Sequence, residues 1–191
     1  MSYHRKRRPI KNEKKIKPSN NGWNLIPPNL TANAGAQNQA RADIKNAEGK
    51  TLGTASLREI KDGVVLTVNV EGLPQGLHAV HIHSVGKCEA PAFTSASPHF
   101  NPINKKHGLN NPAGPHAGDL PDMYVAKNGN GTYELLMDSI TLGSGETSIF
   151  DTDGSTIVIH LTADNNITDP AGNSGDRIAC GMITKAVAER R

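Results

Sequence analysis

Seven residues of types that bind metal ions stand out in this chain of 191 residues. They are six histidines and one aspartate: His81, His83, His99, His107, His116, Asp119 and His160. Imidazole binds zinc and copper, and a carboxylate is an ordinary zinc ligand. These seven ligands complete two four-coordinate sites only if one residue serves both ions. Histidine can do so through its two ring nitrogens, so the sequence predicts a two-metal centre with a shared histidine.

Segments of alternating apolar residues predict the β-strands that must position these ligands. In residues 64–70 every second residue is Val or Leu. His81 and His83 are two positions apart, so a regular strand places both on one face, within reach of one metal. His78 has the opposite parity, and we expect it to be a hydrogen-bonded structural histidine. The expected strands are 40–45, 51–60, 64–70, 78–85, 123–127, 132–138, 156–162 and 178–184.

The composition also favours a turn-rich, all-β domain. The chain has 19 glycines and 12 prolines, and aromatic residues make up only 4% of it. Residues 86–120 form a long segment without a strand pattern, and residues 164–176 form a second loop. A structureless loop as long as the first is unusual in a compact domain, and metal binding could order it. We therefore predict an eight-stranded antiparallel Greek-key barrel or sandwich with two long loops.

Three motifs resemble those of the copper/zinc superoxide dismutase family. Residues 76–83, with the sequence GLHAVHIH, resemble the signature around two copper ligands. Residues 99–120 resemble the zinc loop of that family, with HFNP, HG and HAGDL at matching spacing. Residues 172–181, with the sequence GNSGDRIACG, resemble its C-terminal signature. The resemblance extends over residues 40–185, and its motifs occur in the family's order.

The resemblance implies a role for each ligand. The implied copper ligands are His81, His83, His99 and His160. The implied zinc ligands are His99, His107, His116 and Asp119, so that His99 is the shared residue. One copper ion and one zinc ion per subunit are expected. In this family the copper reacts in turn with two superoxide anions, giving dioxygen and hydrogen peroxide, and the zinc is structural because all its positions are filled by protein.

Two further residues acquire roles through the resemblance. Arg177 matches an arginine beside the copper, whose permanent charge suits a small anion. Alternatively, it only ties down its loop. Asp164 matches an aspartate that bridges ligand histidines of both metals, and the alternative is an ordinary turn residue. Lys87, Lys105 and Lys106 lie in or near the metal loop and are expected to be solvated lysines rather than part of an attractive field.

Two cysteines, Cys88 and Cys180, lie 92 positions apart and form no CxxC pair, which argues against a thiolate zinc site. The resemblance implies that they form one disulfide. Such a bond would be unusual in a reducing compartment, and the alternative is a pair of buried free thiols.

The first residues differ from the rest in charge. Residues 1–17 hold eight basic side chains and one acidic one, a charge of +7, whereas the whole chain is +3. We expect residues 1–39 to be a basic tail and linker and residues 40–191 to be the domain. The tail is either a solvated arm or a patch for nucleic acid or an anionic surface. The sequence contains neither an apolar run of membrane-spanning length nor an export signal, which favours the cytoplasm, with a virion or the nucleus as alternatives.

The sequence thus predicts a copper/zinc-dependent oxidoreductase that dismutates superoxide, and the resemblance implies a homodimer. Two alternatives remain open. One is an inactive relative that uses the same fold to carry copper or to interact with other proteins. The other makes the basic tail the primary functional element, with the domain as its cargo.

Overall fold

The computed structural model describes residues 38–186, so the basic segment 1–17 and most of the predicted tail lie outside the described residues. Within these residues the regular secondary structure is almost entirely β-strand, and long loops connect the strands. These are β1 (Gln39–Asn46), β2 (Thr51–Ile60), β3 (Gly63–Val70), β4 (Gly76–His78), β5 (Val80–His83), β6 (Met123–Val125), β7 (Gly131–Met137), β8 (Thr156–His160), β9 (Arg177–Met182) and β10 (Thr184–Lys185). One short 3-10 helix, η1 (Thr94–Ala96), lies in the first long loop.

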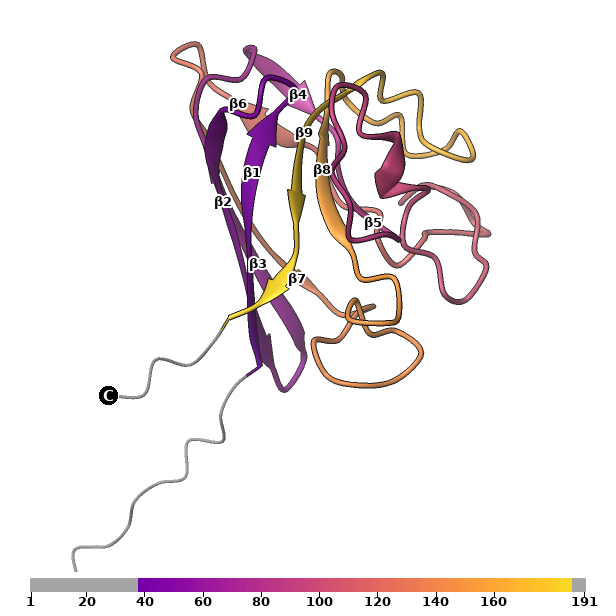
Figure 1. Cartoon of the computed structure of the whole chain (residues 1–191). Coiled ribbons are helices and arrows are strands. Elements are labelled where there is room, and N and C mark those ends of the chain that lie inside the picture. The colour runs from indigo at the N-terminus through magenta and orange to yellow at the C-terminus, as the bar shows by residue number, and fades with distance from the viewer. Residues whose placement is uncertain (1–37, 187–191) are drawn as a thin grey trace, which may run out of the picture. The chain divides into compact units, whose positions relative to one another are not determined.

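All strand pairs are antiparallel, in the order β4-β6-β7-β3-β2-β1-β9-β8-β5, with β10 added to β1 (Figure 1). Strands β4 and β5 are the two ends of this order, yet only Ala79 separates them in the chain. Ala79 donates its N–H to Thr162 O, and its carbonyl accepts the N–H of His160. The sheet therefore curls into a nearly closed barrel, as predicted from the sequence.

The structure has ten strands where eight were predicted, because two expected strands are interrupted. The segment expected over 78–85 is divided at Ala79 into β4 and β5. The last expected strand is divided at Ile183 into β9 and β10, because the N–H of Ile183 donates a hydrogen bond to Ser155 O. Neither interruption changes the fold class.

The interior of the barrel is filled by the apolar residues that alternate along the strands. On β3, Val64, Leu66 and Val68 are fully buried, as their spacing predicted. Burying side chains of this size contributes about 1.5–3 kcal/mol each. On β5 the same alternation sends Ile82 into the core and leaves His83 on the outer face, under the long loops.

The two long loops gather on the side of the barrel formed by β5 and β8 (Figure 1). The outer face of these strands is therefore covered, and all nine residues of β5 and β8 are buried. Strand β8 ends at His160, earlier than predicted, because its register with β9 shifts between Ile159 and His160. Leu161, directly after the end of the strand, is 43% exposed.

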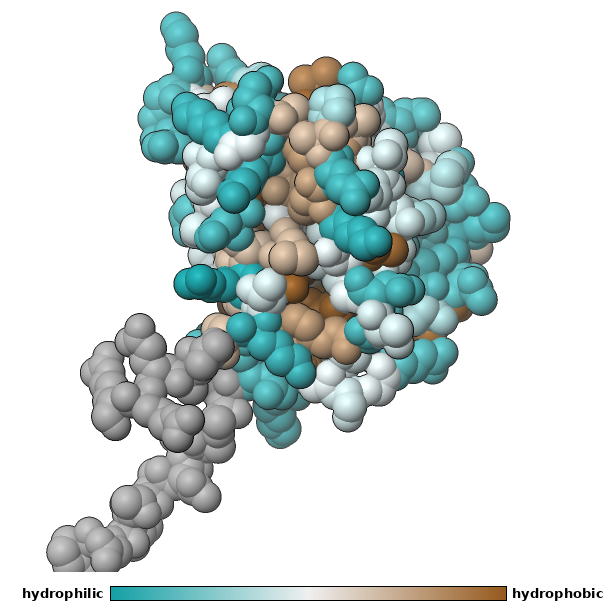
Figure 2. Space-filling model, in the orientation of Figure 1, coloured by the Kyte–Doolittle hydropathy of each residue, from teal (hydrophilic) through white to brown (hydrophobic). Residues whose placement is uncertain are grey.

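The face seen in Figure 2, which carries β1 and β9, is hydrophilic toward its edges and more apolar along its middle. Within residues 38–186, no helix has the length and apolar character needed to cross a bilayer.

Candidate metal centre

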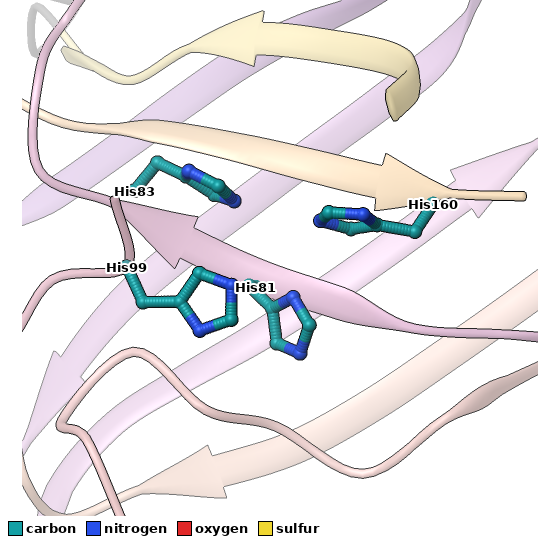
Figure 3. Close-up of side chains that lie close together, drawn as sticks. All are labelled: His81, His83, His99 and His160. Atoms are coloured by element: carbon teal, nitrogen blue, oxygen red, sulfur yellow. The ribbon is translucent and has the colours of Figure 1, made fainter. Parts of the chain in front are cut away.

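Four histidine rings converge on the outer face of β5 (Figure 3). His81 and His83 project from β5, and His160 stands at the end of β8. His99 comes from the first long loop, held beside β5 by a bridge to His83. The ring centroid of His81 lies 3.9 Å from that of His99 and 4.9 Å from that of His160. The strand pairing and the loop therefore bring together residues that are 79 positions apart in the sequence.

One nitrogen of each of these four rings is buried and has no hydrogen-bond partner. The four atoms are His81 Nδ1, His83 Nε2, His99 Nε2 and His160 Nε2. They belong to a group whose ligand atoms lie within 4.8 Å of one another. A buried nitrogen without a partner is costly, and four such atoms facing a common point are typical of a metal site. The donors fit an ion that prefers imidazole.

A second group surrounds the carboxylate of Asp119. Its Oδ1 lies 2.8, 3.0 and 3.2 Å from the Nδ1 atoms of His99, His107 and His116. In a tetrahedral zinc site with bonds of about 2.0–2.1 Å, neighbouring ligand atoms would be about 3.3 Å apart. Two of these nitrogens, on His107 and His116, make no hydrogen bond although they are buried. The group therefore has the composition and approximate spacing of a closed zinc site.

His99 is the only residue that contributes to both four-residue groups, among the described residues. Its Nε2 belongs to the first group and its Nδ1 to the second. This is the shared histidine that the ligand count required.

Short backbone contacts with β5 place the loop residues of both groups. Phe100 donates its N–H to Ile82 O, and Ile82 donates its N–H to Gly118 O. A side chain at position 118 would put its Cβ 2.3 Å from Ile82 O, so only glycine permits this approach. The two contacts fix the adjacent residues His99 and Asp119 against the strand.

The outward nitrogens of two rings are held by backbone carbonyls. His83 Nδ1 donates to Ser97 O at 2.6 Å, and His160 Nδ1 donates to Gly175 O at 3.2 Å. Carbonyls only accept hydrogen bonds, so these contacts place the ring proton on Nδ1. The Nε2 lone pairs are thereby left free to bind a metal.

Asp164 connects the two groups. Its carboxylate accepts hydrogen bonds from His81 Nε2 at 2.7 Å and from His107 Nε2 at 3.0 Å. The bridge expected for this residue is thus present in the structure. The backbone N–H of Asn166 also donates to Asp164, at 2.6 Å. Gly172 passes so close that a Cβ there would lie 1.8 Å from Asp164 Oδ1.

Three rings of the first group are kept neutral by their environment, those of His83, His99 and His160. Burial lowers the pKa of His99 to about 4 and that of His160 to about 3, and it also lowers the pKa of His83. The neighbouring histidines add to the effect, because a second positive charge is unfavourable there. Neutral imidazole is the form that binds metal, so these rings need to lose no proton at neutral pH.

His107 and Asp119 form an oppositely charged pair. Burial opposes charge on His107, but the carboxylates of Asp119 and Asp164 raise its pKa to about 9. Asp119 is also buried, yet its histidine neighbours hold the pKa of its carboxyl well below its usual range. Metal binding at this group must therefore displace a proton.

Arg177 lies beside the first group, at a pocket of about 610 Å³ that is also lined by His99 and His160. Its guanidinium donates to Phe93 O at 2.7 Å and to Ser97 O at 2.9 Å. Arginine has five N–H donors, so three remain for a ligand in the pocket. Both readings of Arg177, as an anion-binding residue and as a loop anchor, are therefore compatible with its contacts.

The remaining predicted residues are also placed. Cys88 and Cys180 form a disulfide. His78 is buried, and its two nitrogens face His160 O and Pro74 O at 2.8 Å, which confirms a structural role. Lys106 is exposed and pairs with Asp169.

No sequence pattern pointed to Asp169 or Ser97, which both support the site. Asp169 Oδ1 accepts the backbone N–H of His107 from 62 positions away. Ser97 O receives hydrogen bonds from both His83 and Arg177. Both contacts depend on how the loops pack, and neither belongs to a spacing pattern.

Comparison with known proteins decides the family. The family model described as copper/zinc superoxide dismutase matches residues 51–183. The chain belongs to the copper/zinc superoxide dismutase family. It is 48% identical to superoxide dismutase [Cu-Zn] 2 of Aquifex aeolicus over 147 residues, which cover 76% of this chain and 86% of that protein.

Other members of the family differ in their names. The superoxide dismutase [Cu-Zn] of Caulobacter vibrioides is 38% identical over 147 residues, covering 75% of this chain and 84% of that protein. The crystal structure of a SOD-like protein from Bacillus subtilis matches with a TM-score of 0.71 and 38% identity, over 74% of this chain and 95% of that one. Because one relative is described only as SOD-like, the site residues of this chain have to be judged on their own geometry.

Proposed function

We propose that this protein dismutates superoxide, converting two superoxide anions and two protons into dioxygen and hydrogen peroxide. The observation that carries the proposal is the position of His99, whose two nitrogens face two different groups of metal-binding side chains. Dismutation is the reaction for which the family is named, and the donor set that it requires is complete in this chain.

We assign copper to the four-histidine group, because imidazole nitrogens suit copper. We assign zinc to the three histidines and Asp119, a closed tetrahedral donor set. Copper bound by the four histidines would supply the one-electron redox chemistry that dismutation needs.

The side chains have three tasks in this reaction. Arg177 attracts and orients the anion in the pocket with its remaining donors. His99 can take up and release a proton at Nε2 while its Nδ1 stays in the second group, so the ring keeps its position. Asp164 holds the rings of His81 and His107 in orientation through their Nε2 protons.

The decisive experiment is a superoxide dismutation assay on protein loaded with one equivalent each of copper and zinc. We expect activity far above that of the same concentration of free copper. The variant His99→Ala should lose the activity and bind the two metals independently. The rival function, an inactive copper carrier, predicts tight copper binding with activity no greater than that of free copper.

A homodimer is the proposed assembly. Leu77 and Tyr124 are direct cross-strand partners on β4 and β6, yet their side chains are 52% and 58% exposed. Sedimentation equilibrium should give twice the 20.3 kDa of one chain. A mass of one chain at micromolar concentration would rule out a stable dimer.

We also propose that the basic segment 1–17 gives the protein affinity for nucleic acid or another polyanion. Its charge of +7 supports this, because clustered Lys and Arg release counterions from phosphates. Deletion of residues 1–20 should abolish salt-dependent binding to DNA without changing dismutation. A cytoplasmic location is proposed from the sequence, with a virion or the nucleus as alternatives, and fractionation of the source cells would test it.

A further inference from the structure

Ser97 adopts a backbone conformation that ordinary residues avoid. Its φ is 65° and its ψ is −164°. This region is accessible essentially to glycine alone, because a Cβ crowds the backbone there. Such outliers concentrate at active sites, and Ser97 lines the pocket that also contains Arg177, His99 and His160.

Both backbone polar groups of Ser97 already make hydrogen bonds within the protein. Its N–H donates to Thr94 O at 3.0 Å. Its carbonyl accepts from His83 Nδ1 at 2.6 Å and from Arg177 Nη2 at 2.9 Å. The polar group of Ser97 that remains for the pocket is its hydroxyl.

Glycine would provide the same backbone hydrogen bonds without the conformational cost. The strained backbone alone therefore does not account for a serine at this position. Ser97 lines the same pocket as Arg177, the residue whose charge attracts anions, and its carbonyl is bonded to the Arg177 guanidinium. A neutral donor beside a fixed positive charge is a suitable second contact for a small anion with two acceptor atoms.

We propose that Ser97 Oγ donates a hydrogen bond to the anion held by Arg177, and so helps to determine which small anions bind. The proposal rests on the function proposed above. The ligand class is a small oxyanion or pseudohalide, superoxide included, that reaches the guanidinium with one end and the hydroxyl with the other.

The test compares Ser97→Ala and Ser97→Gly in protein loaded with copper and zinc. Both variants remove the hydroxyl, but only the glycine variant relieves the backbone. Azide is the probe, titrated by the change in visible absorption of the copper site. Thermal unfolding of the metal-free proteins reports on the strain. Ser56→Ala, at an exposed position of β2, is the control for loss of a serine hydroxyl.

We expect both Ser97 variants to bind azide about tenfold more weakly than the wild type, because each loses one hydrogen bond to a charged group. The glycine variant should unfold about 2–4 °C above the alanine variant, since only it relaxes the backbone. Ser56→Ala should match the wild type in both measurements.

Wild-type azide affinity in Ser97→Gly would overturn the proposal, whether or not the alanine variant is impaired. In that case the alanine effect would come from the retained Cβ and not from the lost hydroxyl. Failure of the function proposed above has a different signature: the wild type would take up both metals but would neither dismutate superoxide nor bind azide.

Discussion

Asp164 accepts a hydrogen bond from His81 Nε2 at 2.7 Å, although the two residues lie 83 positions apart. The same carboxylate accepts a hydrogen bond from His107 Nε2, so one side chain orients a ligand of each group. Histidines that bind metals commonly donate their second nitrogen to a carboxylate in this way. Orientation of the two groups is therefore coupled through a residue that belongs to neither.

Replacing Asp164 with asparagine should weaken metal binding. The amide removes the negative charge and replaces one acceptor oxygen with an NH2 group, which can only donate and so cannot accept from the ring N–H groups or from the Asn166 N–H. We expect affinity for zinc to fall about 10–100-fold, with a smaller change for copper. Competition with a chelator measures the affinity for each metal. Asp62→Asn, in the exposed turn between β2 and β3, is the control, and an equal loss in both variants would contradict the role of Asp164.

Gly172→Ala should produce the same defect by displacing Asp164. The new Cβ would overlap the Asp164 carboxylate, and the φ of +63° adds strain. Gly49→Ala is a matched control, because its φ is +78° but nothing lies within 4 Å of the added Cβ. Both variants should lose stability, and only Gly172→Ala should lose zinc affinity. Equal zinc affinities in the two variants would show that Asp164 can shift without consequence.

The metal-free protein should be most stable near pH 6.5–7. Burial lowers the pKa of His99 to about 4 and that of His160 to about 3. The folding stability that these two rings contribute is therefore fully present above their pKa in the unfolded chain, about 6.5. This stability is lost as the pH falls through the pKa values of the two rings in the folded protein. His107 has a pKa raised to about 9, so its contribution is complete below about 6.5 and is lost as the pH rises through 9.

Urea unfolding of the metal-free protein from pH 3 to pH 10 measures this dependence. We expect the free energy of unfolding to decline on both sides of the maximum, by a few kcal/mol at the acid end. A free energy that keeps rising from pH 7 to pH 10 would contradict the charge assigned to His107.

Spacing alone predicted only the pair of candidate ligands that lies on a strand. His81 and His83 had to share a face of any strand that contained them, and β5 places them so. The loop residue His99 could be assigned only by resemblance, since no periodicity fixes a loop. Its position in the structure depends on the backbone pairing of Phe100 with Ile82.

The supporting contacts could not have been predicted. The bond from Arg177 to Ser97 O spans 80 positions and ends on a carbonyl, which is the same in every residue type. The interruption of the strand at Ala79 likewise depends on the hydrogen bond that the Ala79 N–H donates to Thr162 O rather than on the apolar pattern.

Arg177→Ala should slow anion capture while leaving the metals in place. The variant removes a permanent charge from the pocket beside His99 and His160. We expect kcat/KM for superoxide to fall tenfold or more and to depend less on ionic strength, because a fixed attraction that salt screens has been removed. Arg58→Ala, on the exposed face of β2, should retain the wild-type salt dependence. Loss of copper from Arg177→Ala would instead indicate that the residue acts as a loop anchor.

Removing the disulfide should affect both stability and activity. Cys88 and Cys180 close a loop of 92 positions, for which chain entropy predicts a contribution on the order of 4 kcal/mol. Cys88 precedes the segment whose carbonyls at Phe93 and Ser97 hold Arg177, so that segment loses its covalent tie to β9. The double variant Cys88→Ser/Cys180→Ser should therefore unfold at lower temperature and show reduced kcat/KM. Adding a thiol reductant should reproduce both losses in the wild type and leave the double variant unchanged. If reduction lowered the unfolding temperature but left kcat/KM intact, the hydrogen bonds to Arg177 would have to persist without the disulfide.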